Sequence, residues 1–299
     1  MSITQIKRNM DFTTLPRPVK TYHQKSYDRI SPSKTQFDGK GKTVLVTGGA
    51  TGVGYSISES FAEAGVARII VVSRSPGPQE EAKKSLNAKF PKTEIQTVQA
   101  SITDAGRMEE VIKQAGDIDV LVLCAANTHP ALPSIDIPKD DFEACFTMNV
   151  FGQFSTLSAY LKQPGPSSKT VINISSAAAH MAMSHTAAYG PSKAAFSTIL
   201  QSVAAEFPGG RDGVRIFQFH PGAFLTPMAK SVGFKEDNVP EGFWEDIKLP
   251  GDFAVWCAGP ESTFLHGRFV WVHWDVDELI ALKPRIEKEP GFLQLGLVQ

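Results

Sequence analysis

The stretch VLVTGGATGVG, residues 44–54, joins a run of aliphatic residues to a helical pattern through a turn rich in glycine. Gly48, Gly52 and Gly54 give this turn the spacing G-x-x-x-G-x-G. Glycines there let the backbone approach a pyrophosphate, and the N–H groups that begin the following helix attract its charge. A glycine cluster also occurs in plain tight turns, but its place between strand and helix favours a dinucleotide site.

On both sides of this turn, short apolar runs alternate with helical patterns. We predict strands at 42–48, 67–74, 93–100, 117–126, 169–176, 213–220 and 267–274, and helices at 53–65, 103–116, 139–161 and 189–207. Gly65 would end the first helix, and Thr103 or Asp104 would begin the second. The alternation predicts an α/β protein with a single-domain, Rossmann-like doubly wound fold. Its central parallel β-sheet would hold about seven strands flanked by helices.

Three segments lie outside the alternation. We expect residues 1–41 to be an N-terminal basic extension, 42–275 the catalytic domain and 276–299 a C-terminal extension. Residues 1–42 hold nine lysines and arginines against three aspartates. These charges are interleaved with polar residues and prolines, which favours a solvated or docked segment over a partner- or membrane-binding arm. The long connection 221–249 carries several aromatic residues and is expected to act as a substrate lid.

Composition narrows the class of protein. The net charge of −1 over 299 residues gives no global positive field for nucleic acid. The three cysteines have no metal-type spacing, so we expect no metal site, no disulfide framework and a reducing compartment. No apolar run reaches the length of a membrane span. We therefore expect a cytoplasmic protein that binds neither nucleic acid nor membrane.

The end of the second predicted strand indicates the type of dinucleotide. An acidic residue about 20 positions after the glycines binds the ribose 2′-hydroxyl in NAD-dependent folds. Here Ser73 lies 19 residues after Gly54, and Arg74 follows it. Serine and arginine suit a 2′-phosphate, which a guanidinium binds through charge-assisted hydrogen bonds. A surface arginine at a strand end is the alternative, and we favour NADP(H).

The stretch Tyr189-Gly190-Pro191-Ser192-Lys193 contains a tyrosine and a lysine spaced to share one helix face. Pro191 is tolerated only in the first turn of a helix, so it marks the helix start. A lysine ammonium beside the tyrosine would lower its pKa from about 10 by favouring the phenolate. The spacing alone is weak, but the pair follows the fifth predicted strand, at the sheet edge where ligands bind.

Two further polar residues lie close to this region. The hydroxyl of Ser176 could donate to a substrate carbonyl and stabilise the alkoxide that develops, or it could merely cap the strand end. Asn149 falls inside a predicted helix, where asparagine is disfavoured. It could be exposed, structural or functional.

Taken together, these motifs resemble the short-chain dehydrogenase/reductase superfamily over roughly residues 42–275. The matching elements, all in family order, are T-G-x-x-x-G-x-G (47–54), Asn149, Ser176, Tyr189-x-x-x-Lys193 and Pro221-Gly222-x-x-x-Thr226. The flanks TYHQKSYDRISPSK (21–34) and GRFVWVHWDVDEL (267–279) are similar to reductases of fungal natural-product pathways.

The resemblance implies a catalytic tetrad. Tyr189 would be the general acid and base, and Lys193 would lower its pKa and hold the nicotinamide ribose. Ser176 would orient the carbonyl, and Asn149 would organise a water relay to Lys193. The residues expected at NADP(H) are Gly48, Thr51, Gly52, Val53, Gly54, Ser73, Arg74, Ser101, Ile102, Ala125, Ala126, Tyr189, Lys193, Pro221, Gly222, Phe224 and Thr226.

Two positions depart from the family pattern. The usual Asn-Asn-Ala-Gly after the fourth strand is Leu123-Cys124-Ala125-Ala126 here, although the two alanines still allow close approach of the cofactor. The acidic residue expected near the adenine is Ser101.

Residues 177–188, between Ser176 and Tyr189, are expected to border the substrate. His180, Met181 and His185 are candidates there, together with Phe234 from the connection 221–249. Each histidine could equally be exposed or packed, and methionines often only fill space. The aromatic residues predict a mainly apolar pocket, which fits a medium-sized hydrophobic ketone or alcohol better than a charged metabolite.

We therefore predict an NADP(H)-dependent ketoreductase or alcohol dehydrogenase, expected in secondary metabolism. The resemblance implies a homodimer or homotetramer built through residues 139–161 and 189–207. Two alternatives stay open: a non-redox isomerase, dehydratase or cyclase on the same scaffold, and a protein that senses the nucleotide without turnover.

Overall fold

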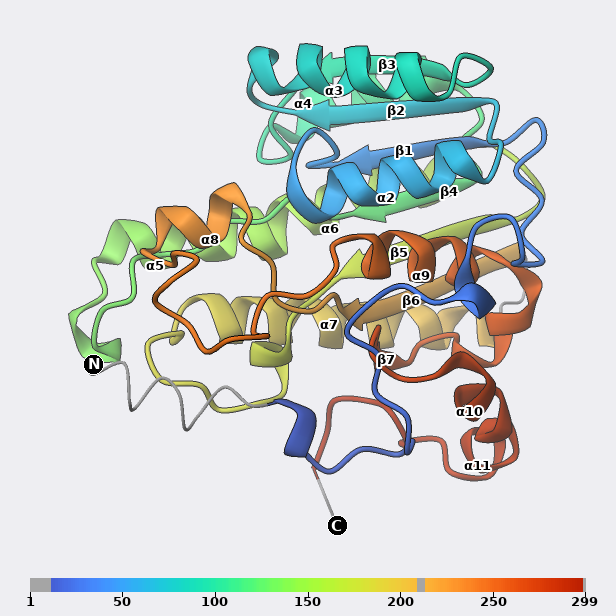
Figure 1. Ribbon diagram of the computed structural model, residues 1–299. Coiled ribbons are helices and arrows are strands. Elements are labelled where there is room, and N and C mark those ends of the chain that lie inside the picture. Colours follow the sequence, from blue (N-terminus) through green and yellow to red (C-terminus); the bar gives the residue numbers. More distant parts are fainter. Residues whose placement is uncertain (1–11, 209–212, 298–299) are drawn as a thin grey trace.

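The computed structural model describes residues 12–208 and 213–297. Seven strands form one sheet in the order β3-β2-β1-β4-β5-β6-β7, and every neighbouring pair is parallel (Figure 1). The strands are β1 Thr43–Thr47, β2 Arg68–Ser73, β3 Glu94–Gln99, β4 Val120–Leu123, β5 Lys169–Ile174, β6 Val214–His220 and β7 Phe269–Trp271. The predicted doubly wound α/β fold is confirmed.

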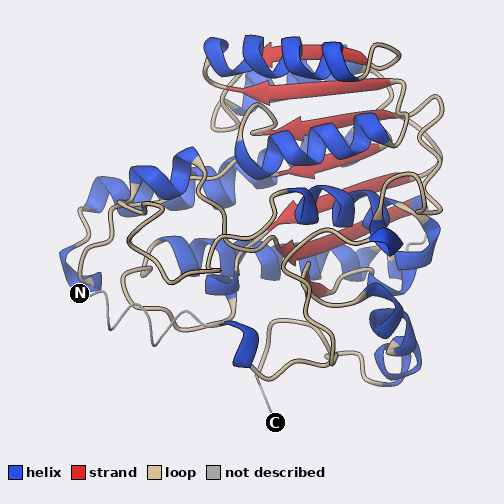
Figure 2. Cartoon of the chain, in the orientation of Figure 1, coloured by secondary structure: helices blue, strands red, loops and turns tan. Residues whose placement is uncertain are grey.

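Helices cover both faces of the sheet (Figure 2). One layer holds α2 Gly52–Glu63, α3 Pro76–Lys89 and α9 Lys248–Ala258, and the other holds α4 Ala105–Ala115, α6 Gln153–Lys162 and α7 Tyr189–Glu206. Successive strand residues face opposite layers: Val44 and Val46 belong to the first apolar core, and Leu45 belongs to the second. Because both faces are covered, all five residues of β1 are buried.

The structure differs from the predicted elements at several places, and it adds the unpredicted helices α8 Pro227–Ser231, α9, α10 Val276–Ala281 and α11 Lys283–Lys288. Helix α3 was not predicted, because it opens on Pro-Gly-Pro and buries only Gln79, Ala82 and Leu86. The fourth strand is shorter than 117–126, since β4 ends at Leu123. The predicted helix 139–161 is divided into α5 Lys139–Phe146, a π-helical segment η4 Thr147–Gly152, and α6.

The described part of the basic extension packs against the C-terminal region, which contains α10 Val276–Ala281 and α11 Lys283–Lys288 (Figure 1). Arg29 forms ion pairs with Glu261 and Asp277. The Thr21 hydroxyl donates to Glu278 over 2.6 Å, and Tyr22 pairs with Trp274 in an antiparallel bridge. Residues near the two ends of the chain therefore support each other beside β7.

Among the helices that the structure describes, none combines the length and apolar character needed to cross a membrane.

Candidate active site

The glycine-rich turn between β1 and α2 needs its glycines for space as well as conformation. Gly48 has a φ of +69°, and a Cβ there would lie 2.9 Å from the Ala125 Cα. A Cβ on Gly54 would lie 2.3 Å from the Gly48 carbonyl oxygen. Side chains at these positions would therefore collide with the neighbouring backbone. With glycine at both positions, the backbone N–H groups at the start of α2 stay accessible.

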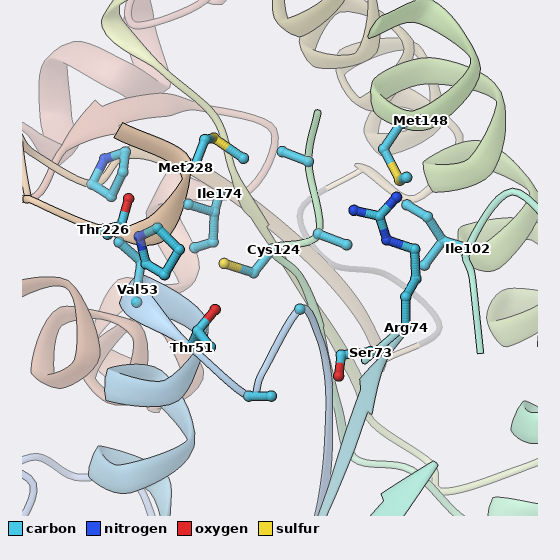
Figure 3. Close-up of a pocket in the computed structure, with 18 of the residues that line it drawn as sticks. Thr51, Val53, Ser73, Arg74, Ile102, Cys124, Met148, Ile174, Thr226 and Met228 are labelled. Atoms are coloured by element: carbon cyan, nitrogen blue, oxygen red, sulfur yellow. The ribbon is translucent and has the colours of Figure 1, made fainter. Parts of the chain in front are cut away.

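This turn forms one wall of a cleft of about 500 Å³ at the carboxyl ends of the strands (Figure 3). The cleft is where parallel α/β sheets bind ligands. Of the residues predicted at the cofactor, it brings together Gly48, Thr51, Gly52, Val53, Gly54, Ser73, Arg74, Ile102, Ala125, Ala126, Tyr189, Lys193, Pro221, Gly222, Phe224 and Thr226. Ser101 does not line it, and its hydroxyl instead forms a 2.7 Å hydrogen bond with that of Thr103.

Several lining residues were not among those predicted at the cofactor. Cys124, Met148 and Met228 all contribute to the cleft. Met148 precedes Asn149 in η4, and Met228 belongs to α8 Pro227–Ser231, which begins after the Thr226 cap. Methionine and cysteine side chains have no chemistry that would mark them as phosphate ligands. Only their position next to a recognised motif could have indicated that these three residues line the cleft.

The end of β2 presents a serine and an arginine to the cleft. The Ser73 hydroxyl is buried and has no hydrogen-bond partner among the described residues. Arg74 is exposed, and its guanidinium extends into the cleft toward Met148 and Ile102 (Figure 3). An unpartnered buried hydroxyl is costly, so a ligand that bonds to it would recover that cost. Together with the open glycine turn, these groups fit a dinucleotide with phosphate oxygens.

Tyr189 and Lys193 lie in the first turn of α7, with Pro191 between them as expected. Lys193 is only 3% exposed, and its Nζ donates to the Ile174 carbonyl over 2.9 Å. Burial lowers the pKa of Lys193 from 10.5 to about 8. The ammonium is thus held at the end of β5 in surroundings that disfavour its charge.

The expected lowering of the Tyr189 pKa by Lys193 is wrong for this structure. Burial raises the pKa of Tyr189 from 10.0 to about 12, although a hydrogen bond with Ser176 partly opposes the rise. Ser176 also accepts a hydrogen bond from the Ala178 N–H, so it caps η5 Ala177–Ala179 as well as contacting Tyr189. At neutral pH the tyrosine is therefore a phenol that can donate a proton.

Asn149 is fully buried within η4 and joins two neighbouring elements. Its Oδ1 accepts from the Asn127 N–H over 2.8 Å, and its Nδ2 donates to the Asn127 carbonyl over 2.8 Å and to the Ser192 hydroxyl over 2.9 Å. These bonds use both of its N–H groups and fix the loop after β4 against α7. The water relay expected of Asn149 stays a prediction.

The four candidate substrate residues lie outside the cleft. His180 and Met181 line a second cavity of about 610 Å³ beside Phe12 and Trp271, and His180 accepts a hydrogen bond from the Trp271 indole. His185 donates through Nδ1 to the Leu132 carbonyl over 2.9 Å. The Phe234 ring packs in an aromatic cluster with Phe243 and Trp244. Their roles toward substrate stay predictions.

Comparison with known proteins identifies the family. The family model described as short chain dehydrogenase matches residues 42–237. The chain belongs to this family. It is 51% identical to short chain dehydrogenase/reductase AacuD of Aspergillus aculeatus over 96% of this chain and 99% of that protein. It is 50% identical to short chain dehydrogenase/reductase nsrO of Aspergillus novofumigatus over 96% of this chain and 99% of that protein. It is 45% identical to a short chain dehydrogenase/reductase of Claviceps purpurea over 96% of this chain and 96% of that protein.

Solved structures show the same fold. L-Sorbose reductase from Gluconobacter frateurii, complexed with NADPH and L-sorbose, matches with a TM-score of 0.68 and 20% identity over 79% of this chain and 97% of that one. Levodione reductase matches with a TM-score of 0.70 and 22% identity over 78% of this chain and 96% of that one. Family membership makes this chain an oxidoreductase with a nicotinamide cofactor.

Proposed function

We propose that this protein is an NADP(H)-dependent ketoreductase or alcohol dehydrogenase that acts on a mainly hydrophobic carbonyl or hydroxyl compound. The observation that supports it is one continuous cleft. Its walls carry Tyr189 and Lys193 in one part, and Ser73 and Arg74 at the end of β2. A proton donor and candidate ligands for a 2′-phosphate thus serve the same dinucleotide site.

The bound nicotinamide would supply or accept the hydride at the substrate carbon. The chain's own residues handle the proton and the orientation. Tyr189 donates its phenolic proton to the carbonyl oxygen as negative charge develops there. Ser176, hydrogen-bonded to Tyr189, orients the same oxygen, and Lys193 supplies a cation that stabilises the tyrosinate left after transfer. The Pro221–Gly222 turn and Thr226 would hold the nicotinamide carboxamide.

The apolar surroundings support a hydrophobic substrate. Phe224 and Met228 line the cleft, and the aromatic cluster of Phe234, Phe243 and Trp244 follows in the same connection. Such side chains exclude water and offer no charge to a polar metabolite. The high identity to the Aspergillus short chain dehydrogenases/reductases AacuD and nsrO supports a place in secondary metabolism. NADPH in the L-sorbose reductase structure is in keeping with the proposed cofactor.

We also propose a homodimer or homotetramer. Phe142, Phe151 and Phe154, on α5, η4 and α6, are 40%, 65% and 46% exposed. Large apolar side chains gathered on one helical segment are typical of a surface that another protein covers. We retain the cytoplasm as the proposed location.

The function is tested by a screen of hydrophobic ketones with NADPH, followed by nicotinamide absorbance, on wild type and Tyr189→Phe. We expect wild type to oxidise NADPH with at least one ketone, and the variant to lose turnover while it still binds NADPH. Turnover retained by the variant would move the proton-donating role to another residue. Conversion of a compound without any change in nicotinamide absorbance would instead favour an isomerase, dehydratase or cyclase.

A further inference from the structure

A buried carboxylate–imidazole pair lies outside the recognised tetrad. Glu245, near the end of the connection 221–249, and His273, just after β7, have side chains that are 5% and 1% exposed. The His273 Nε2 lies 2.8 Å and 2.9 Å from the two carboxylate oxygens of Glu245. Burying a carboxylate costs free energy unless its hydrogen-bond partners are well placed. The contacts of the buried pair therefore indicate what holds it there.

The carboxylate of Glu245 lies directly against the turn that follows β6. Its Oε2 accepts a hydrogen bond from the Ala223 N–H over 2.8 Å, and the Glu245 N–H donates to the Ala223 carbonyl over 3.1 Å. Gly222 has a φ of +105°, and a Cβ there would lie only 2.3 Å from Oε2 of Glu245. Pro221 and Gly222 line the cofactor cleft, so the pair supports the back of a cofactor-binding wall.

The hydrogen-bond geometry fixes the roles of the atoms. A carboxylate can only accept, so Nε2 of His273 carries a hydrogen and donates it. Glu245 therefore receives one hydrogen bond from the imidazole and one from the Ala223 backbone. The Nδ1 of His273 is buried and has no hydrogen-bond partner among the described residues. Glu245 is thus the group through which His273 acts on the turn.

The N-terminal segment holds this pair from the other side. The Tyr22 ring stacks on the His273 ring, with centroids 4.5 Å apart and planes 6° from parallel. The His23 N–H donates to the His273 carbonyl over 2.8 Å, and the Asp246 N–H donates to the Gln24 carbonyl over 3.0 Å. Segment 22–24 is therefore bonded to both His273 and the residue that follows Glu245.

We propose that Glu245 is a positioning residue for the nicotinamide end of the cofactor. Braced by His273 and segment 22–24, its carboxylate sets the Pro221–Gly222–Ala223 turn in the conformation that receives the nicotinamide group. This inference rests on the proposed NADP(H)-dependent function. It also gives the N-terminal segment a role, because Tyr22 and His23 both contact His273, which holds the Glu245 carboxylate.

The test compares two ligands that differ at one end. NADPH would extend along the cleft from the end of β2 to the Pro221–Gly222 turn, whereas adenosine 2′,5′-bisphosphate would bind only at the end of β2. Removal of the carboxylate in Glu245→Ala leaves buried donors unpaired, and we expect about tenfold or greater weakening of NADPH. The bisphosphate, which does not reach the turn, should bind within about twofold of wild type. Isothermal titration calorimetry measures both affinities.

Three further variants separate positioning from a general loss of structure. Glu245→Gln keeps an oxygen that can accept from Ala223, and it should restore most of the NADPH affinity. His273→Gln keeps an N–H donor toward Glu245, whereas His273→Leu removes it, so only the leucine variant should match Glu245→Ala. Glu241→Ala removes an exposed glutamate from the same connection and should leave both affinities unchanged.

Equal weakening of both ligands by Glu245→Ala and His273→Leu would show a merely structural pair and overturn the inference. So would unchanged NADPH binding in both variants. If Glu245→Ala does not fold, the contrast between His273→Gln and His273→Leu decides. A wild-type protein that binds the bisphosphate and NADPH supports the proposed cofactor whatever the variants do. A wild-type protein that binds neither overturns the proposed function, and the inference with it.

Discussion

Replacing Arg74 by alanine would remove the guanidinium that extends into the cleft at the end of β2. A hydrogen bond to a charged group contributes about 1.5–3 kcal/mol, and about 1.4 kcal/mol corresponds to a tenfold change in affinity. Because Arg74 is exposed to solvent, we expect the lower end of this range, about tenfold weaker binding of NADPH. Ser73 would retain part of the interaction with the 2′-phosphate.

NADH has no 2′-phosphate, so its affinity should change by less than about threefold in Arg74→Ala. Fluorescence titration of both cofactors into wild type and variant measures the ratio directly. The preference of wild type for NADPH should also weaken as salt is added, since exposed charges are screened, and that of the variant should not. Arg285→Ala, which removes a half-exposed arginine from α11, is the matched control. Equal losses of NADPH and NADH would refute the assignment of Arg74 to the 2′-phosphate.

Two predictions follow from the pKa values in the site. Burial raises the pKa of Tyr189 to about 12, and alcohol oxidation needs the tyrosinate. The rate of alcohol oxidation should therefore rise from pH 7 to pH 10, while the rate of ketone reduction stays constant. An oxidation rate that does not change with pH would contradict this prediction. The pKa of Lys193 is about 8 in the fold against 10.5 unfolded, so its charge costs stability below pH 8 and this cost fades as pH rises toward 10.5. Lys193→Met should therefore raise the free energy of unfolding of the cofactor-free protein at pH 7 by about 1–3 kcal/mol, and chemical denaturation should show the gain shrinking by pH 10.

The sequence predicted the cleft well because its motifs follow strand ends. In a parallel sheet, the residues after β1, β2, β4, β5 and β6 meet at one edge, whatever their separation along the chain. Gly54, Arg74, Ala125 and Lys193 were therefore expected to lie together, and each lines the cleft. Ser101 follows the edge strand β3 and lies outside the cleft, although its neighbours Ala100 and Ile102 line it. Its hydroxyl is instead hydrogen-bonded to that of Thr103.

What the sequence could not predict depends on packing between distant segments. The direction of the Tyr189 pKa shift is set by how deeply the fold buries the phenol, and the spacing to Lys193 carries no information on depth. The π-helical segment η4 interrupts the predicted helix where Asn149 bonds to the Asn127 backbone and to the Ser192 hydroxyl. These three residues lie in separate segments of the chain, and no local sequence pattern connects them. The Glu245–His273 pair likewise has no periodic signal, because its partners come from a loop and a strand end.

These shifts also suggest an order of events in the site. Burial disfavours charge on both Lys193 and Tyr189. With a pKa of about 8 the lysine is still mainly an ammonium at pH 7, whereas the tyrosine, with a pKa of about 12, is a phenol. An anionic dinucleotide in the same cleft would favour the lysine ammonium, since opposite charges stabilise each other where water is excluded. The ammonium in turn stabilises the tyrosinate that remains after proton transfer. Binding of the cofactor would therefore extend the pH range over which Lys193 stays charged, and the proposed acid–base step would be best supported when the cofactor is present.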